Sequence, residues 1–171
     1  ALRGDRFAQV ELGRLFSLGL GLERDHEKAV EWSRKSAAQG AARAQLNLGV
    51  AYEGGLGVKQ DLSEALALYQ KAAERGLARA HYALGLLYRD GKGITRDDKK
   101  SFDYMLLAAT AGFPPAQVAV AQAYDLGLGV QPESILLIRN GSNASVMPLE
   151  RSTARRILGL PLHTPLIGFV G

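Results

Sequence analysis

The sequence contains recurring Gly-x-Gly pairs, and of all its features these most resemble a known binding motif. Gly-x-Gly turns cradle phosphate groups in dinucleotide-binding folds, because their backbone N–H groups approach the anion closely. That chemistry requires a strand before the turn and a third glycine at a fixed step, whereas each pair here follows a helical pattern. The glycines therefore predict turns between helices, and the pairs are Gly19/Gly21, Gly55/Gly57, Gly91/Gly93 and Gly127/Gly129.

The histidines and serines predict neither a metal site nor a hydrolase. His26, His81 and His163 stand at unrelated positions and the chain has no cysteine, so no spacing brings zinc ligands together. No serine lies in a Gly-x-Ser-x-Gly sequence, the setting of a nucleophile in many hydrolases. We therefore expect a protein that is not an enzyme, takes no cofactor and has no small-molecule substrate.

The distribution of charge disfavours nucleic acid and membranes as partners. The formal net charge is +4, but residues 1–133 carry 17 Lys/Arg against 16 Asp/Glu, and the rest of the chain contributes +3. A near-neutral array lacks the basic stripe that binds nucleic acid. No apolar run approaches the roughly 18 residues needed to cross a bilayer. We expect no nucleic acid partner and no membrane span.

A repeat of 36 residues organises most of the chain. Three complete units run over 5–40, 41–76 and 77–112, and a partial fourth unit covers 113–133. This regularity predicts a stacked helical array, in which each unit buries its apolar faces against its neighbours. The recurring positions include Ala8/Ala44/Ala80/Ala116, Leu12/Leu48/Leu84/Val120, Phe16/Tyr52/Tyr88/Tyr124 and Asp25/Asp61/Asp97/Glu133.

Each unit is predicted to hold two helices joined by the glycine turn. Apolar residues at steps of three and four indicate a helix in the first half of each unit, over residues 6–18, 43–53, 79–90 and 115–126. The second helix is expected to begin after an aspartate, whose carboxylate accepts free backbone N–H bonds; these are Asp25, Asp61 and Asp97. In the second unit this helix should turn Leu68 inward and place Tyr69 at the edge of the apolar stripe.

Two recurring features predict how the helices pack. A glycine inside a helix costs about 1 kcal/mol relative to alanine, so its return in every complete unit predicts a close approach of two helices. The apolar residue after each glycine pair is expected to fill the gap between the two helices. The helical glycines are Gly13, Gly49 and Gly85, and the residues after the pairs are Leu22, Val58, Ile94 and Val130.

The repeat resembles the Sel-one-like repeat, a relative of the tetratricopeptide repeat. The stretch ALGLLYRDGKGITRDDKKSFDYMLLAATAG carries the Leu-Gly-x-x-Tyr core, the Gly-x-Gly-Ile turn and the Ala-Ala-x-x-Gly close. The resemblance covers residues 5–133 and implies an all-α fold, a right-handed α-solenoid of stacked antiparallel helix pairs. It also implies a scaffold or adaptor that contacts another protein, in a family common in bacteria.

The first helices of tetratricopeptide-like arrays line a concave groove, and by analogy of position this groove would bind a segment of a partner protein. Arginine pairs with carboxylates through two hydrogen bonds, and tyrosine and arginine are common interface hot spots. We expect Arg43, Arg79 and Tyr82 to contact the partner; the alternative is that the groove residues are ordinary solvated or inter-helix residues. The complete predicted set is Arg14, Ser17, Arg43, Leu46, Val50, Glu53, Arg79, Tyr82, Leu86 and Arg89.

Residues 134–171 depart from the repeat. The run ILLI followed by Asn-Gly, the sequence Arg-x-x-Leu-Gly-Leu-Pro and the final PLIGFVG resemble the interdomain segment of GT-B glycosyltransferases. The resemblance implies short α/β elements, although Asn143 and Met147 stand where those enzymes usually have Asp and Phe. It suggests an alternative function, the accessory repeat region of a carbohydrate-modifying protein whose catalytic domain is truncated.

The first residues, ALRGDRFAQV, contain no initiator Met and no signal peptide pattern. We therefore expect a fragment or a processed form. A cytoplasmic location and, if a signal is missing, a periplasmic or secreted one both stay open.

Overall fold

The computed structural model describes residues 4–126, with side chains to 123, and these residues form seven helices and no strand. The predicted all-α fold is therefore confirmed for this part of the chain. The prediction of α/β elements in 134–171 lies outside the described residues. The helices, each of 13 residues, are α1 (Arg6–Leu18), α2 (His26–Ala38), α3 (Ala42–Gly54), α4 (Leu62–Glu74), α5 (Ala78–Asp90), α6 (Asp98–Thr110) and α7 (Pro114–Leu126).

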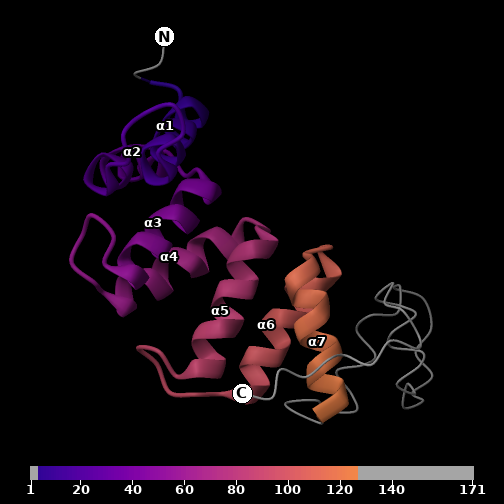
Figure 1. The fold of residues 1–171 in the computed structure, drawn as a ribbon. Helices are drawn as coiled ribbons and strands as arrows, with labels where there is room; N and C mark the ends of the chain where they lie inside the picture. The colour runs from indigo at the N-terminus through magenta and orange to yellow at the C-terminus, as the bar shows by residue number, and fades with distance from the viewer. Residues whose placement is uncertain (1–3, 127–171) are drawn as a thin grey trace.

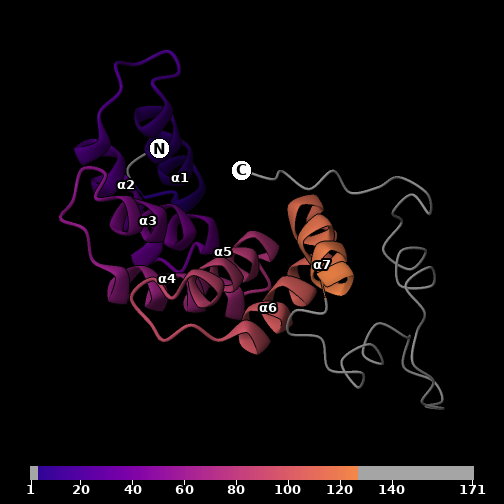
Figure 2. The same ribbon diagram turned by 60° about the horizontal axis from the view of Figure 1, so that its bottom comes forward.

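The helices form antiparallel pairs that stack into a solenoid. Within the units, α1 packs on α2, α3 on α4 and α5 on α6, and consecutive units meet through α2 with α3, α4 with α5 and α6 with α7. The pairs follow one another from α1 at one end to α7 at the other (Figure 1). Figure 2 shows that the array is curved, with α1, α3 and α5 on its inner side and α2, α4 and α6 on its outer side.

The helices end and begin where the local sequence predicts. Each first helix of the three complete units ends on a glycine in the left-handed conformation, with φ of 69° at Gly19 and 65° at Gly55 and Gly91. That conformation brings a side chain too close to the backbone in other residues. The second helices are capped by Asp25, Asp61 and Asp97, whose carboxylates accept backbone N–H bonds of 2.9–3.0 Å.

The close approach predicted at the helical glycines is confirmed, but a different group faces each one. A Cβ on Gly13 would lie 3.0 Å from Ser33 Oγ, and one on Gly85 would lie 2.8 Å from Met105 Cγ. A Cβ on Gly49 would lie 2.5 Å from the Tyr69 ring at Cε1. Ser33, Tyr69 and Met105 are separated by one repeat length each, so a single position of the second helix fills the space over the glycine.

Tyr69 is therefore at the centre of the second unit, and the prediction that it lies at the edge of the apolar stripe is wrong. Its side chain is 1% exposed, whereas Leu68, the residue expected inward, is 5% exposed. The ring fits because Gly49 has no side chain. The Tyr69 hydroxyl donates a hydrogen bond of 2.7 Å to Glu53 Oε2. Burial, with a smaller contribution from the neighbouring Glu53 carboxylate, raises the pKa of Tyr69 above its usual range, so the phenol is neutral.

The turn residues fill gaps only where an earlier unit is present. Val58 packs against Val30, Leu48 and Leu68, and Ile94 packs against the core formed by α3, α4 and α5. The corresponding prediction for Leu22 is wrong, because that side chain is 43% exposed. No unit precedes the first one within the described residues, so Leu22 lacks the neighbouring helix pair against which Val58 and Ile94 pack. The turns therefore hold neighbouring units together as well as their own helix pair.

Candidate protein-binding groove

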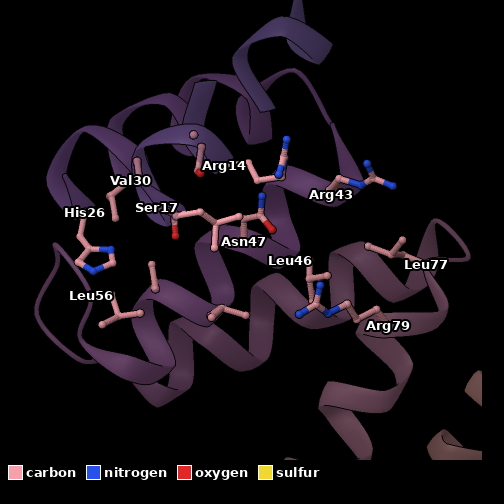
Figure 3. Close-up of a pocket in the computed structure, with 16 residues that line it drawn as sticks. Arg14, Ser17, His26, Val30, Arg43, Leu46, Asn47, Leu56, Leu77 and Arg79 are labelled. Carbon is pink, nitrogen blue, oxygen red and sulfur yellow. The ribbon is translucent and has the colours of Figure 1, made fainter. Parts of the chain in front are cut away.

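A pocket of about 470 Å³ opens among α1, α2, α3 and the beginning of α5. Hollows of roughly 300–1,000 Å³ are typical of ligand sites. Figure 3 shows that side chains from these separate elements lie around one space. The lining residues are Gly13, Arg14, Ser17 and Leu18 of α1, His26, Ala29, Val30 and Ser33 of α2, Arg43, Leu46, Asn47, Val50 and Ala51 of α3, Leu56 and Leu77 of the turns, and Arg79 of α5.

The two ends of this pocket differ in chemistry. Arg43 and Arg79 lie at one end, on the right of Figure 3, while His26 and Leu56 lie at the other end. Both arginines are the second residue of their helix, and they are separated by one repeat length. The array therefore places two arginines, from equivalent positions of successive units, at one end of the pocket.

The lining of the pocket contains positive charge and no carboxylate. Three arginines line it, and neither Asp nor Glu occurs among its lining residues. Arg14 donates a hydrogen bond of 2.9 Å to Glu11 on the same helix. Within residues 4–123, no salt bridge involves Arg43 or Arg79, and both side chains are exposed.

The helix ends beside these arginines add to the positive field. The N-caps of α3 and α5 are Ala41 and Leu77, and neither forms a side-chain cap hydrogen bond. By contrast, aspartates cap α1, α2, α4 and α6. Free N–H groups and the helix dipole make a helix N-terminus favourable for negative charge. The two helices that carry Arg43 and Arg79 thus begin without a carboxylate of their own.

The structure brings six of the ten predicted groove residues together around the pocket: Arg14, Ser17, Arg43, Leu46, Val50 and Arg79. Leu46 forms part of the floor, since it is 4% exposed and belongs to the core. Val50 is 41% exposed and forms part of the wall. The other four, Glu53, Tyr82, Leu86 and Arg89, do not line this pocket.

Those four residues have other contacts. Glu53 follows Arg43 by ten residues, which turns it about 80° away around the helix, and its carboxylate accepts the Tyr69 hydrogen bond. Tyr82 and Leu86 pack on the core of α6 and α7, where the Tyr82 ring centroid lies 5.3 Å from that of Phe113. Arg89 pairs with the neighbouring Asp90 at 2.8 Å.

Several lining residues were not predicted from the sequence. Asn47 carried a weak signal, because alanine stands at the equivalent positions Ala83 and Ala119, although the first unit has Glu11 there. His26, Leu56 and the N-cap residue Leu77 come from turns and helix ends of different units. Their convergence depends on how the units stack, which the repeat pattern does not specify.

Two other kinds of site are not found in the described part of the chain. Across residues 4–126, no group of three or more His, Asp or Glu side chains is arranged to bind a metal ion. None of the helices described is both long enough and apolar enough to span a bilayer. The pocket on the inner side of the array is therefore the principal candidate site in these residues.

Comparison with known proteins identifies the repeats. The family model for the Sel1 repeat matches residues 6–40, 42–77, 78–113 and 114–135. No curated protein matches the chain.

Two solved structures are similar to this one. A Sel1 repeat protein from Oxalobacter formigenes superimposes with a TM-score of 0.70 and 36% identity, over 76% of this chain. The protective antigen c5321 of uropathogenic Escherichia coli, which has an SLR fold, superimposes with a TM-score of 0.71 and 30% identity, over 92% of this chain. The chain spans 53% of the first protein and 38% of the second. The resemblance found in the sequence is confirmed: the chain belongs to the Sel1 repeat family.

Proposed function

We propose that this chain is a scaffold that binds a segment of another protein in the pocket between Arg79 and Leu56. Sel1 repeats mediate protein–protein interactions, and proteins of this family are generally non-enzymatic scaffolds. The observation that carries the proposal is the pocket itself, which combines exposed apolar side chains with arginine on the inner side of the array. Concave apolar hollows with a few polar groups are the usual form of a recognition site.

The apolar surface in this pocket supports the proposal. Val50, Leu56 and Leu18 are 41%, 39% and 56% exposed, and all three line the pocket. Isolated exposed apolar residues are normal on a protein surface, whereas a group of them around one hollow marks a site for a partner. Burying these side chains under a partner segment would stabilise the complex through the hydrophobic effect.

Filling the pocket is expected to weaken binding. A displayed library of random dodecapeptides can be selected on the wild-type protein, and the affinity of each enriched peptide measured by fluorescence anisotropy. Val50→Trp places a large ring in the pocket and should weaken binding by at least about tenfold, or 1.4 kcal/mol. Leu56→Trp fills the same pocket from the turn and should act in the same direction.

Val118→Trp is the matched control, because Val118 is also 41% exposed and lies on α7, outside the pocket. Circular dichroism confirms that each variant remains folded. Equal affinity of the Val50→Trp and Val118→Trp variants for the selected peptides would contradict the pocket assignment. A selection that enriches no binding peptide would count against the proposal as well.

A further inference from the structure

We infer that the segment recognised by this pocket is acidic and contains one aliphatic residue. Its carboxylates would pair with Arg43 and Arg79, and its aliphatic side chain would lie against Val50 and Leu56. This inference rests on the proposed function, since it names the chemistry of the partner that occupies the same pocket. The argument depends on the charge balance, the register of the arginines and the apolar end of the pocket.

The charge balance of the pocket departs from that of the array. Residues 1–133 have a nearly equal number of basic and acidic residues. The pocket nevertheless gathers three arginines and no carboxylate among its lining residues. Some cations outside the pocket have a carboxylate partner, as in Lys28–Asp25 at 2.8 Å and Arg96–Asp98 at 2.9 Å. A partner with carboxylates would provide the counter-charge that the described residues do not supply to Arg43 and Arg79.

The register of the two arginines fits an extended segment rather than a single ion. Arg43 and Arg79 occupy equivalent positions in adjacent units, and the residues at this position in the first and fourth units are Phe7 and Pro115. Only two consecutive units therefore present a guanidinium group here. A guanidinium group binds a carboxylate through two parallel hydrogen bonds. Two of them on successive units would bind two carboxylates along one peptide, beside the uncapped N-termini of α3 and α5.

The apolar end of the pocket indicates a second property of the partner segment, an aliphatic side chain. Val50 and Leu56 offer apolar surface there, and they remain 41% and 39% exposed. An aliphatic side chain of the partner buries this surface, whereas a phosphate or sugar would leave it exposed. Nucleic acid would also require a longer basic stripe than the near-neutral array provides. The combination favours a protein segment with carboxylates over a polyanion without apolar groups.

Between the two ends, Asn47 supplies polar groups that an extended peptide requires. Its side chain offers two N–H donors and one carbonyl acceptor, and Figure 3 places it between the basic and the apolar ends. The free N–H and C=O groups of an extended backbone could both pair with such an amide. This arrangement fits a peptide backbone crossing the pocket from Arg79 toward Leu56.

The test compares two decapeptide pools that differ only in charge. The acidic pool carries Asp or Glu at four positions around one fixed Leu, and the amide pool carries Asn or Gln at the same positions. A ten-nucleotide oligothymidine serves as a polyanion without aliphatic side chains. In anisotropy titrations, the acidic pool is expected to bind at least about tenfold more tightly than the other two probes, and its binding should weaken as salt increases.

Reversing the charge of Arg43 and Arg79 tests whether these two arginines cause the preference for acidic peptides. The variant R43E/R79E should lose the preference for the acidic pool and should favour a pool with Lys at the four positions. Its matched control is K71E/K99E, which changes the charge of the protein equally at two exposed lysines outside the pocket. This control should bind the acidic pool within about twofold of wild type. If R43E/R79E does not fold, R43Q/R79Q removes the same charges and should also abolish the preference.

The outcomes separate this inference from the proposed function. If both pools bind equally and Val50→Trp weakens both, the pocket binds peptides but the acidic preference is overturned. If Val50→Trp leaves all peptide binding unchanged, the proposed function itself is wrong. Equal binding of oligothymidine and the acidic pool would overturn the choice of a protein segment. Retention of the acidic preference by R43E/R79E would overturn the role of the two arginines.

Discussion

Replacing Gly57 with alanine is expected to lower the free energy of unfolding by about 2–5 kcal/mol, combining left-handed strain with overpacking. Gly57 has a φ of 68°, and a Cβ there would lie 2.3 Å from the carbonyl carbon and oxygen of His26. Those atoms belong to the backbone at the start of α2, so no side chain can rotate away. The turn of the second unit would have to separate from the first unit. Urea unfolding followed by circular dichroism measures the loss.

Gly21 is the matched control for this substitution. It occupies the equivalent position in the first unit and has a similar φ of 73°, but a Cβ there would have nothing within 4 Å. Gly21→Ala should therefore cost only the left-handed strain, about 1–2 kcal/mol. The difference between the two variants isolates the contact between units. Equal destabilisation by the two substitutions would show that the turn of the second unit does not hold the units together.

Truncating Tyr69 to alanine is expected to destabilise the array by about 3–5 kcal/mol, the usual cost of removing a large buried aromatic side chain. Tyr69 is 1% exposed and fills the space over Gly49 between α3 and α4. The substitution leaves a cavity in the core that the second unit shares with the third. Thermal and urea unfolding should both report the loss.

Tyr69→Phe separates the ring from the hydroxyl. It keeps the packing over Gly49 and removes the 2.7 Å hydrogen bond to Glu53, so it should cost about 1–2 kcal/mol. Leu107→Ala is a control on α6, where the side chain is 51% exposed, and it should change stability by no more than about 0.5 kcal/mol. A loss from Tyr69→Ala as small as that from Leu107→Ala would contradict the central position of Tyr69.

The helices could be predicted from the sequence because their limits depend on local chemistry. Asp61 begins α4 by accepting backbone N–H bonds, and Gly55 ends α3 in the left-handed conformation. Neither effect requires knowledge of distant residues, so a repeated pattern of caps and glycines determines the helix pairs. The same reasoning identified Gly49 as a point of close approach, since a costly helical glycine requires a packing reason.

Packing partners were harder to predict, because they depend on the space left by neighbours. Tyr69 is buried since Gly49 leaves room for its ring, and the second unit alone combines that glycine with a tyrosine at this position. Leu22 follows the same pattern as Val58, yet it lacks an earlier unit to pack against within the described residues. A repeat position therefore predicts a type of residue, while its contacts follow from its place in the stack.

In the candidate site too, some residues could be placed from the sequence and others could not. Arg43 and Arg79 could be placed together from the repeat length, because they occupy equivalent positions on α3 and α5 and both line the pocket. The position of Glu53 could not be predicted in this way. Glu53 lies on a different side of α3 from Arg43, and its carboxylate accepts the hydrogen bond from the Tyr69 hydroxyl. Tyr82 is directed to Phe113 by the packing of α5 against α6 and α7. These side chains depend on contacts between helices rather than on the period of the sequence.

Mapping a bound peptide by nuclear magnetic resonance tests the central claim most directly. Titrating the tightest peptide of the acidic pool into isotope-labelled protein should shift the backbone amide signals of Arg43, Asn47, Val50, Leu56 and Arg79. The signals of α6 and α7 should stay unchanged, since those helices do not line the pocket. Shifts concentrated on α6 and α7, with the pocket residues unaffected, would contradict the claim that the inner pocket of the array binds the partner.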